Sequence, residues 1–139
     1  MEEICTSTEE TLRAGRRMAT RLSCGDVVSL EGDLGTGKTH FVKGLADGLG
    51  ISGPVSSPTF TVIHEYPGPF FSLYHADFYR LESATEVPAL GLEDCFASGI
   101  TVIEWGDRFP EVLPANAKRV RFHILPDASR RLEFSGGGN

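Results

Sequence analysis

The residues most able to do chemistry form one uninterrupted run, Gly32-Asp33-Leu34-Gly35-Thr36-Gly37-Lys38-Thr39. This run matches the phosphate-binding pattern G-x-x-x-x-G-K-[ST] at every fixed position. Its glycines allow backbone N–H groups to turn inward around phosphate oxygens. We expect Lys38 to reach the β- and γ-phosphates of a nucleoside triphosphate, and the Thr39 hydroxyl to bind Mg²⁺. The run therefore predicts a nucleotide site.

Two acidic residues could complete a metal site beside this loop, because such a loop needs an acid at the end of a neighbouring strand. Glu104 directly follows the apolar run Ile100–Ile103, as an acid that closes a buried strand would. Asp77 lies in a denser polar cluster, and alternation places it on one strand face with His75 and Tyr79. The residues alone leave both acids open as candidates.

A third feature is the loop Ser56-Ser57-Pro58-Thr59. In P-loop switches, a loop that carries Ser or Thr can close on the γ-phosphate and metal and release after hydrolysis. Thr59 is the candidate for this role, and a plain turn before a strand is the alternative. Trp105, next to Glu104, is expected either beside the site or in the core.

Hydrophobic periodicity and turn residues predict the elements that must position these side chains. In chain order, we expect a helix capped by Ser7 and Glu10 and ending before Gly25, a strand over 26–31, a helix ended by Gly50, a β-hairpin over 60–66 and 70–76, a weak helix over 82–97, a buried strand over 100–103 and a hairpin over 119–125 and 131–134. The pattern predicts an α/β single-domain P-loop NTPase fold with a mixed parallel and antiparallel sheet flanked by helices. The domain covers 1–135, and a flexible Gly-rich tail covers 136–139.

Composition limits the classes of partner. The chain has 139 residues and a net charge of −6, which disfavours general nucleic-acid binding, DNA included. No apolar run approaches the ~18 residues that a membrane helix needs. The acidic N-terminus lacks the basic and apolar regions of a secretory signal, which predicts a cytoplasmic protein. Basic residues cluster in two places, where we expect a partner interface or proximity to the nucleotide's phosphates: Arg13, Arg16, Arg17 and Arg21, and Lys118, Arg119, Arg121, Arg130 and Arg131.

Four segments together point to a known family: the run 32–39, Ser-Pro-Thr-Phe-Thr at 57–61, His-Ala-Asp-Phe-Tyr-Arg at 75–80 and Ile-Glu-Trp-Gly-Asp-Arg at 103–108. With them, the chain resembles the bacterial TsaE (YjeE) family, the small P-loop ATPases of the tRNA threonylcarbamoyladenosine pathway. The resemblance spans almost the whole chain. Its specificity comes from the His-x-Asp-x-Tyr-Arg run and the later Glu-Trp. The departures are small: Thr36 stands where many relatives have Ala, and His40 where many have Thr.

The resemblance implies ATP or ADP with Mg²⁺ at the loop. It implies that Thr39 and Glu104 ligate the metal, with Asp77 in a Walker-B-like place and Thr59 in a switch-like loop, so that the expected catalytic set is Lys38, Thr59, Asp77 and Glu104. It also places Thr8 or its neighbours and Asp107 near the nucleotide base. The implied nucleotide contacts are Thr8, Asp33, Leu34, Gly35, Thr36, Gly37, Lys38, Thr39, His40 and Asp107.

The resemblance also implies partners. Members of this family bind TsaD and TsaB, which modify the adenosine beside the anticodon, and supply ATP-dependent turnover without carrying out the transfer. We therefore expect tRNA to reach this chain only through that assembly. The alternatives are a small-molecule P-loop kinase, for which only Arg80 and Arg108 could supply phosphate-facing arginines, and a nucleotide-binding module with negligible hydrolysis. The absence of a guanine-reading Asn-Lys-x-Asp pattern favours ATP.

Overall fold

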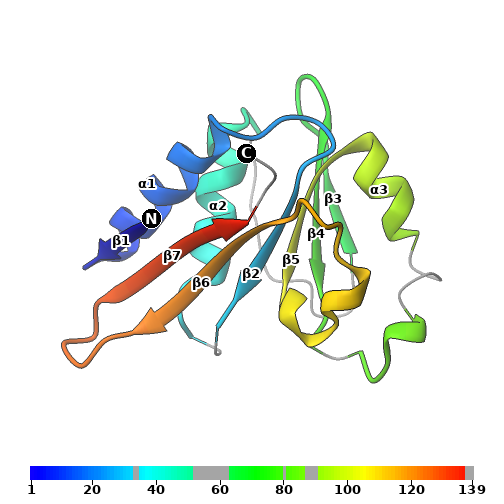
Figure 1. The fold of residues 1–139 in the computed structure, drawn as a ribbon. Helices are drawn as coiled ribbons and strands as arrows, with labels where there is room; N and C mark the ends of the chain where they lie inside the picture. Colours follow the sequence, from blue (N-terminus) through cyan, green and yellow to red (C-terminus); the bar gives the residue numbers. More distant parts are fainter. Residues whose placement is uncertain (33–34, 52–62, 80, 87–90, 137–139) are drawn as a thin grey trace.

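The strands of the chain form one mixed sheet (Figure 1). The structure is a computed structural model and describes residues 1–32, 35–51, 63–79, 81–86 and 91–136. Within these ranges, seven strands lie in the order β1-β7-β6-β2-β5-β4-β3. Their bounds are β1 Glu2–Cys5, β2 Val27–Glu31, β3 Ile63–Tyr66, β4 Ser72–Asp77, β5 Gly99–Glu104, β6 Lys118–Ile124 and β7 Arg130–Gly136.

The four central strands are parallel, and the outer strands are not. β2 pairs in parallel with both β5 and β6, and β5 pairs in parallel with β4. The pairs β3–β4, β6–β7 and β1–β7 are antiparallel. The predicted mixed sheet and both predicted hairpins are thus confirmed, as is the buried strand at 100–103, which lies within the fully buried β5.

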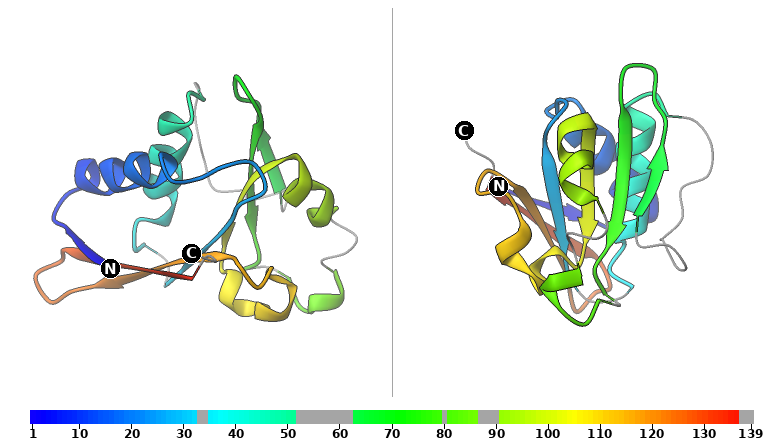
Figure 2. Two further views of the ribbon diagram at one scale, coloured as in Figure 1. Left: turned by 45° about the horizontal axis from the view of Figure 1, so that its top comes forward. Right: turned by 90° about the vertical axis from the view of Figure 1, so that its right-hand side faces the viewer.

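Helices cover both faces of the sheet, as the two views of Figure 2 show. α1 (Thr8–Ala19) and α2 (Lys38–Gly48) lie on one face. Among the described residues, the other face carries α3 (Leu92–Ser98) and the short 3-10 segments η1 (Ala84–Glu86), η3 (Gly106–Arg108) and η4 (Pro110–Val112). This gives the three-layer α/β arrangement expected of a sheet with buried parallel strands.

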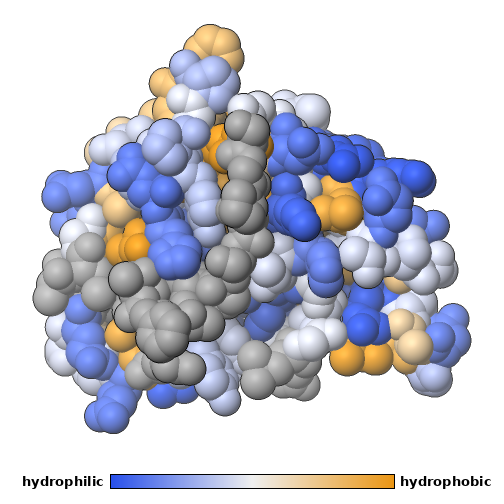
Figure 3. Space-filling view, turned by 180° about the vertical axis from the view of Figure 1, so that it is seen from behind, coloured by the Kyte–Doolittle hydropathy of each residue, from blue (hydrophilic) through white to orange (hydrophobic). Residues whose placement is uncertain are grey.

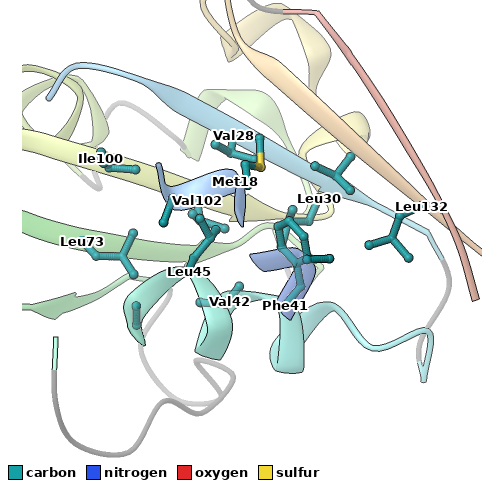
Figure 4. Close-up of a cluster of buried hydrophobic side chains, with 14 of the residues drawn as sticks. Met18, Val28, Leu30, Phe41, Val42, Leu45, Leu73, Ile100, Val102 and Leu132 are labelled. Carbon is teal, nitrogen blue, oxygen red and sulfur yellow. The ribbon is translucent and has the colours of Figure 1, made fainter. Parts of the chain in front are cut away.

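Strand alternation divides the buried side chains between the two faces. Leu30, Val102 and Leu73 point toward α1 and α2, where they pack with Phe41 and Leu45 (Figure 4). A second cluster on the opposite face contains Val27, Ala76, Ile103, Phe78 and Leu92. Because side chains alternate along a strand, Asp77 lies on the same face of β4 as Leu73, and Glu104 lies on the same face of β5 as Val102. Both acids therefore lie on the face of the sheet that carries α2.

Glycines allow α1 and α2 to pack closely, as Gly15 and Gly44 show. A Cβ added at Gly15 would lie 2.3 Å from the backbone oxygen of Phe41, and one added at Gly44 would lie 2.1 Å from that of Leu12. Real Cβ atoms do not approach so near, so the helix backbones meet where side chains are missing. Because α2 begins in the phosphate-binding loop, this contact also positions the loop.

The first helix ends at Ala19, before Gly25 as predicted, but the N-terminal segment differs from the prediction in two other respects. Ser7 Oγ accepts a hydrogen bond from the Glu10 N–H at 3.2 Å, as expected of the cap, but the Glu10 carboxylate bonds the N–H of Thr6 instead of that of Ser7. Residues 2–5 form β1, which was not predicted, because four residues with a single buried position carry little periodicity.

Seen from behind, the described residues present a largely hydrophilic surface, with apolar side chains in separate small patches (Figure 3). The projection at its top is the turn between β3 and β4, where Phe70 is 91% exposed. No helix in the described part of the chain is long and apolar enough to cross a membrane. β7 ends at Gly136, and the rest of the predicted tail lies outside the described residues.

Candidate nucleotide site

The carboxyl ends of the parallel strands meet at one edge of the sheet, the edge where open α/β sheets bind ligands. Glu31, Asp77 and Glu104 are the last residues of β2, β4 and β5. Asp77 is the register partner of Glu104, which is in turn the partner of Leu30 on β2. The two predicted metal acids therefore lie side by side, next to the strand that leads into the phosphate-binding loop.

The loop connects β2 to α2 as the motif predicts. Gly37 has a φ of 99°, a left-handed conformation that glycine adopts without strain, and α2 begins at the next residue. Lys38 is buried, with its Nζ 2.6 Å from the Gly32 carbonyl oxygen and 3.9 Å from the centroid of the Trp105 ring. Asp33 and Leu34 lie outside the described residues. The N-terminus of α2 adds a partial positive charge that favours an anion here.

A cavity of about 570 Å³ opens in front of the loop, a volume in the range of small-molecule sites. In the described part of the chain, its wall comes from the end of β1 and the start of α1, the loop and first turn of α2, the ends of β4 and β5, and the turn from β6 into β7. The lining residues are Cys5, Thr6, Ser7, Thr8, Thr11, Gly35, Gly37, Lys38, Thr39, His40, Asp77, Tyr79, Glu104, Trp105, Ala128 and Arg130.

The two acids have different surroundings. Glu104 is buried, and its Oε2 lies 2.5 Å from Nε2 of the fully buried His75. Asp77 Oδ1 accepts a hydrogen bond from the N–H of Tyr79 at 2.8 Å. Burial raises the pKa of the Asp77 carboxyl, the Tyr79 N–H opposes this shift, and the nearby charge of Glu104 raises the pKa further. The Tyr79 ring packs on Trp105 with the ring centroids 5.1 Å apart, beside the acids.

The donors in this cavity fit Mg²⁺ held together with a nucleotide. Thr39 offers a hydroxyl, and Asp77 and Glu104 offer carboxylates, all oxygen ligands of the kind that this hard cation takes. The described residues contain no group of three or more His, Cys, Asp and Glu that would by itself hold an ion. Mg²⁺ is commonly bound by one or two carboxylates together with substrate phosphates and water, so this sparse donor set is the expected one.

The structure brings most of the predicted site residues together. Those that line the cavity are Thr8, Gly35, Gly37, Lys38, Thr39, His40, Asp77 and Glu104. Thr36 is buried within the loop and is not part of the cavity wall. Asp107 lies exposed in η3, also outside the wall. Asp33, Leu34 and Thr59 lie outside the described residues, so their predicted roles stay predictions.

Two parts of the wall were not predicted as such from the sequence. One is the end of β1 with Cys5 and Thr6, which arrives by a strand that was not predicted. The other is the β6–β7 turn, where Arg130 Nη2 donates to the carbonyl of Gly35 at 3.2 Å. Arg130 belongs to the C-terminal basic cluster, for which proximity to the nucleotide's phosphates was one of two predictions, but nothing in the sequence distinguishes it from its neighbours. Trp105, which the sequence left between site and core, lines the cavity.

Ion pairs distinguish Arg130 from the other basic residues of the C-terminal cluster. Arg119 and Arg121 pair with the buried Glu31 at 3.6 and 3.2 Å. The pairs Lys118–Asp26 and Arg131–Glu133 measure 3.4 and 3.2 Å. Arg130 has no ion pair with a carboxylate among the described residues. Its guanidinium lines the cavity and donates to the carbonyl oxygens of Ala128 and Gly35.

Comparison with known proteins identifies the family. The family model described as "Threonylcarbamoyl adenosine biosynthesis protein TsaE" matches residues 5–132. The chain belongs to the TsaE family. The matched range contains every residue that lines the cavity, from Cys5 to Arg130.

Individual relatives are similar in sequence to this chain over nearly its full length. The Bacillus subtilis protein named "tRNA threonylcarbamoyladenosine biosynthesis protein TsaE" is 42% identical to this chain, over 94% of this chain and 82% of the relative. The one in Treponema pallidum is 41% identical over 95% and 98%, and the one in Nostoc is 48% identical over 91% and 80%. The crystal structure of Bacillus subtilis YdiB superposes with a TM-score of 0.85 at 37% identity, over 100% of this chain and 86% of that one. The resemblance and the P-loop NTPase fold predicted from sequence are both confirmed.

Proposed function

We propose that this protein binds ATP with Mg²⁺ in the cavity and hydrolyses it as the ATP-driven component of tRNA threonylcarbamoyladenosine synthesis. The proposal assigns it TsaD- and TsaB-like partners, which carry out the transfer, and a place in the cytoplasm. One observation carries the ATPase assignment. The phosphate-binding residues Lys38 and Thr39 share a single cavity wall with the adjacent strand-end acids Asp77 and Glu104. The names of the relatives carry the tRNA assignment.

The residues would divide the work as follows. Loop N–H groups and the N-terminus of α2 hold the phosphates, and Lys38 neutralises charge on them. Thr39, Glu104 and Asp77 are the oxygen donors toward Mg²⁺. When bound, the ion supplies charge neutralisation at the β- and γ-phosphates. Arg130 adds a positive charge on the side of the loop where Gly35 lies.

Hydrolysis by the isolated chain should be slow. The chain contains no glutamine, the residue that positions the attacking water in several P-loop NTPases. Arg108 donates to the Leu81 carbonyl at 2.7 Å and does not line the cavity, which weakens the kinase alternative. The lack of groups that stabilise the transition state, such as an arginine finger, can lower the rate of hydrolysis by roughly 10³–10⁵-fold, and a partner protein commonly supplies these groups in trans. We therefore expect the partners to stimulate ATP turnover.

The test is phosphate release from ATP by the purified chain, alone and with TsaD, TsaB and tRNA. The expected result is slow release alone, clear stimulation by the partners and loss of that stimulation in Glu104→Gln. Lys43→Ala, a change on the exposed side of α2, is the matched control and should behave as wild type. Rapid turnover by the single chain would contradict the proposal and favour a kinase-like enzyme. No turnover under any condition would favour a nucleotide-binding module.

A filter-binding titration with tRNA tests the route by which RNA reaches the protein. The net charge of −6 repels a polyanion at long range. At ~150 mM salt, a few phosphate contacts leave only weak, nonspecific affinity. We expect tRNA retention only when the partners are present. Submicromolar binding by the isolated chain would instead make one of the basic clusters a direct RNA site.

A further inference from the structure

His75 is a fully buried polar side chain to which neither the sequence motif nor the proposed mechanism gives a role. It lies on β4, two residues before Asp77, and its backbone is in register with Val102 on β5. Alternation along β4 and β5 puts the side chains of His75, Asp77 and Glu104 on one face of the sheet. Glu104 therefore reaches back along the strand pair to His75, and the two side chains meet below the cavity floor at 2.5 Å.

The surroundings of the ring decide which nitrogen carries the proton. Nε2 faces the Glu104 carboxylate, whereas Nδ1 is buried with no hydrogen-bond partner among the described residues. A proton on Nδ1 alone would leave a buried N–H unsatisfied and would set the Nε2 lone pair against the carboxylate oxygens. His75 therefore donates Nε2–H to Oε2 of Glu104.

This bond constrains the carboxylate of a candidate metal ligand. Oε2 is engaged by His75, and none of the hydrogen bonds of the described residues uses Oε1. A glutamate side chain otherwise rotates about three bonds, so a fixed Oε2 also fixes the direction of Oε1. Partners of this kind, one step removed from the metal, orient metal-ligating side chains in many proteins, and their loss typically costs about 10- to 100-fold in metal affinity.

We propose that His75 is a positioning residue that holds Oε2 of Glu104 so that Oε1 is presented to Mg²⁺ beside Thr39. The inference rests on the proposed function, because it takes Glu104 as a ligand of the nucleotide-bound ion. His75 itself touches neither metal nor nucleotide. Its effect should appear in Mg²⁺-dependent nucleotide binding and be absent from binding without metal.

The experiment measures ADP affinity by calorimetry, with Mg²⁺ and with EDTA, and takes the ratio of the two as the gain from Mg²⁺. The variants are His75→Gln, whose side-chain amide N–H can occupy the place of Nε2–H, and His75→Leu, which fills a buried site without a donor. We expect His75→Leu to lower the gain by about 10- to 100-fold and His75→Gln to keep most of it. Affinity in EDTA should be unchanged in both.

Thermal melting together with the affinity in EDTA separates this role from simple packing. Leu leaves the buried Glu104 carboxylate without a donor, whereas the Gln amide can satisfy it, so His75→Leu should melt at a lower temperature than His75→Gln. A purely structural role predicts that this loss of stability lowers ADP affinity in EDTA as well as in Mg²⁺. The proposal predicts that a folded His75→Leu variant keeps wild-type affinity in EDTA and loses only the Mg²⁺ gain. His75→Asn, whose amide is too short to reach Glu104, replaces the Leu variant if the latter fails to fold.

Controls distinguish the two proposals. A wild-type protein that gains nothing from Mg²⁺, or a Glu104→Gln variant that keeps the full gain, would overturn the metal assignment, and the role of His75 with it. A normal wild-type gain that is lost in Glu104→Gln but retained in His75→Leu would overturn the positioning role alone.

Discussion

Lys38 and Trp105 form a cation–π pair in the wall of the cavity, with the Lys38 Nζ 3.9 Å from the ring centroid. Trp105 is the chain's one tryptophan, and its backbone has a φ of 62°, a conformation rare for a bulky side chain. The backbone N–H of Trp105 donates to the Leu30 carbonyl at 3.0 Å, which connects Trp105 to the strand before the loop. Strained residues of this kind are concentrated at functional sites.

This pair predicts an optical signal for nucleotide binding. Phosphates would draw the Lys38 ammonium away from the ring, so Trp105 fluorescence should change as MgADP is titrated. Lys38→Ala should remove the change and lower ADP affinity by roughly ten- to a hundred-fold, the value of a charge-assisted hydrogen bond of about 1.5–3 kcal/mol. Lys43→Ala should respond as wild type. Equal ADP affinity in folded Lys38→Ala and wild type would remove the nucleotide assignment.

Arg130 should contribute to nucleotide affinity from outside the sequence motif. Its half-buried guanidinium lines the cavity and has no carboxylate partner among the described residues. We expect Arg130→Gln to weaken ADP binding roughly two- to five-fold, a small effect because solvent screens the charge. The loss should be larger at low ionic strength. Arg13→Gln, on the exposed side of α1 and paired with Glu9, is the control. Equal losses in both variants would indicate a general charge effect.

Asp77 should lower the stability of the protein at neutral pH. Burial raises the pKa of its carboxyl, so the folded state favours the protonated form more than the unfolded state does. The resulting destabilisation is absent below the unfolded pKa, grows as pH rises, and is complete above the folded pKa. Asp77→Asn keeps an oxygen for the Tyr79 N–H and removes the charge. In the absence of metal, it should melt a few degrees higher than wild type at pH 7.

Melting curves at several pH values check this sign. The difference between Asp77→Asn and wild type should shrink as pH falls toward the ordinary range for an aspartate. The gain in ADP affinity from Mg²⁺ should be smaller in the same variant. A more stable protein with weaker Mg²⁺-dependent binding would show that the Asp77 charge serves the nucleotide site at the expense of stability. A variant less stable than wild type at pH 7 would mean that the Asp77 charge is compensated in the folded state.

Gly44 should be intolerant of any side chain. A Cβ there would lie 2.1 Å from the Leu12 carbonyl oxygen, a backbone atom that cannot move aside cheaply. Although Ala favours helices, we expect Gly44→Ala to destabilise the protein by about 1–3 kcal/mol or more, as overpacking does. Chemical denaturation measures this, with Lys43→Ala as the control at the preceding, exposed position of α2. Wild-type stability in Gly44→Ala would show that α1 and α2 can separate without cost.

The sequence by itself determined the features of this protein that are formed by residues adjacent in the chain. The run 32–39 specifies a strand–loop–helix connection because its glycines and its lysine act within one turn of chain. The apolar run 100–103 specifies a central strand because only a strand covered on both faces buries every residue. Glu104 could be recognised as a strand-end acid for the same reason, and Asp77 from the polar cluster in which it lies.

The tertiary structure decided which of these parts meet. The strand order puts β4 beside β5, so Asp77 and Glu104 become register partners and His75 comes within reach of Glu104. It also brings Arg130 to Gly35 across 95 positions of chain. No local pattern encodes such contacts, because they depend on which strands pair and in which register. The sequence by itself therefore determined the phosphate-binding loop and its two candidate acids, whereas the arrangement of strands decided the remaining wall of the cavity.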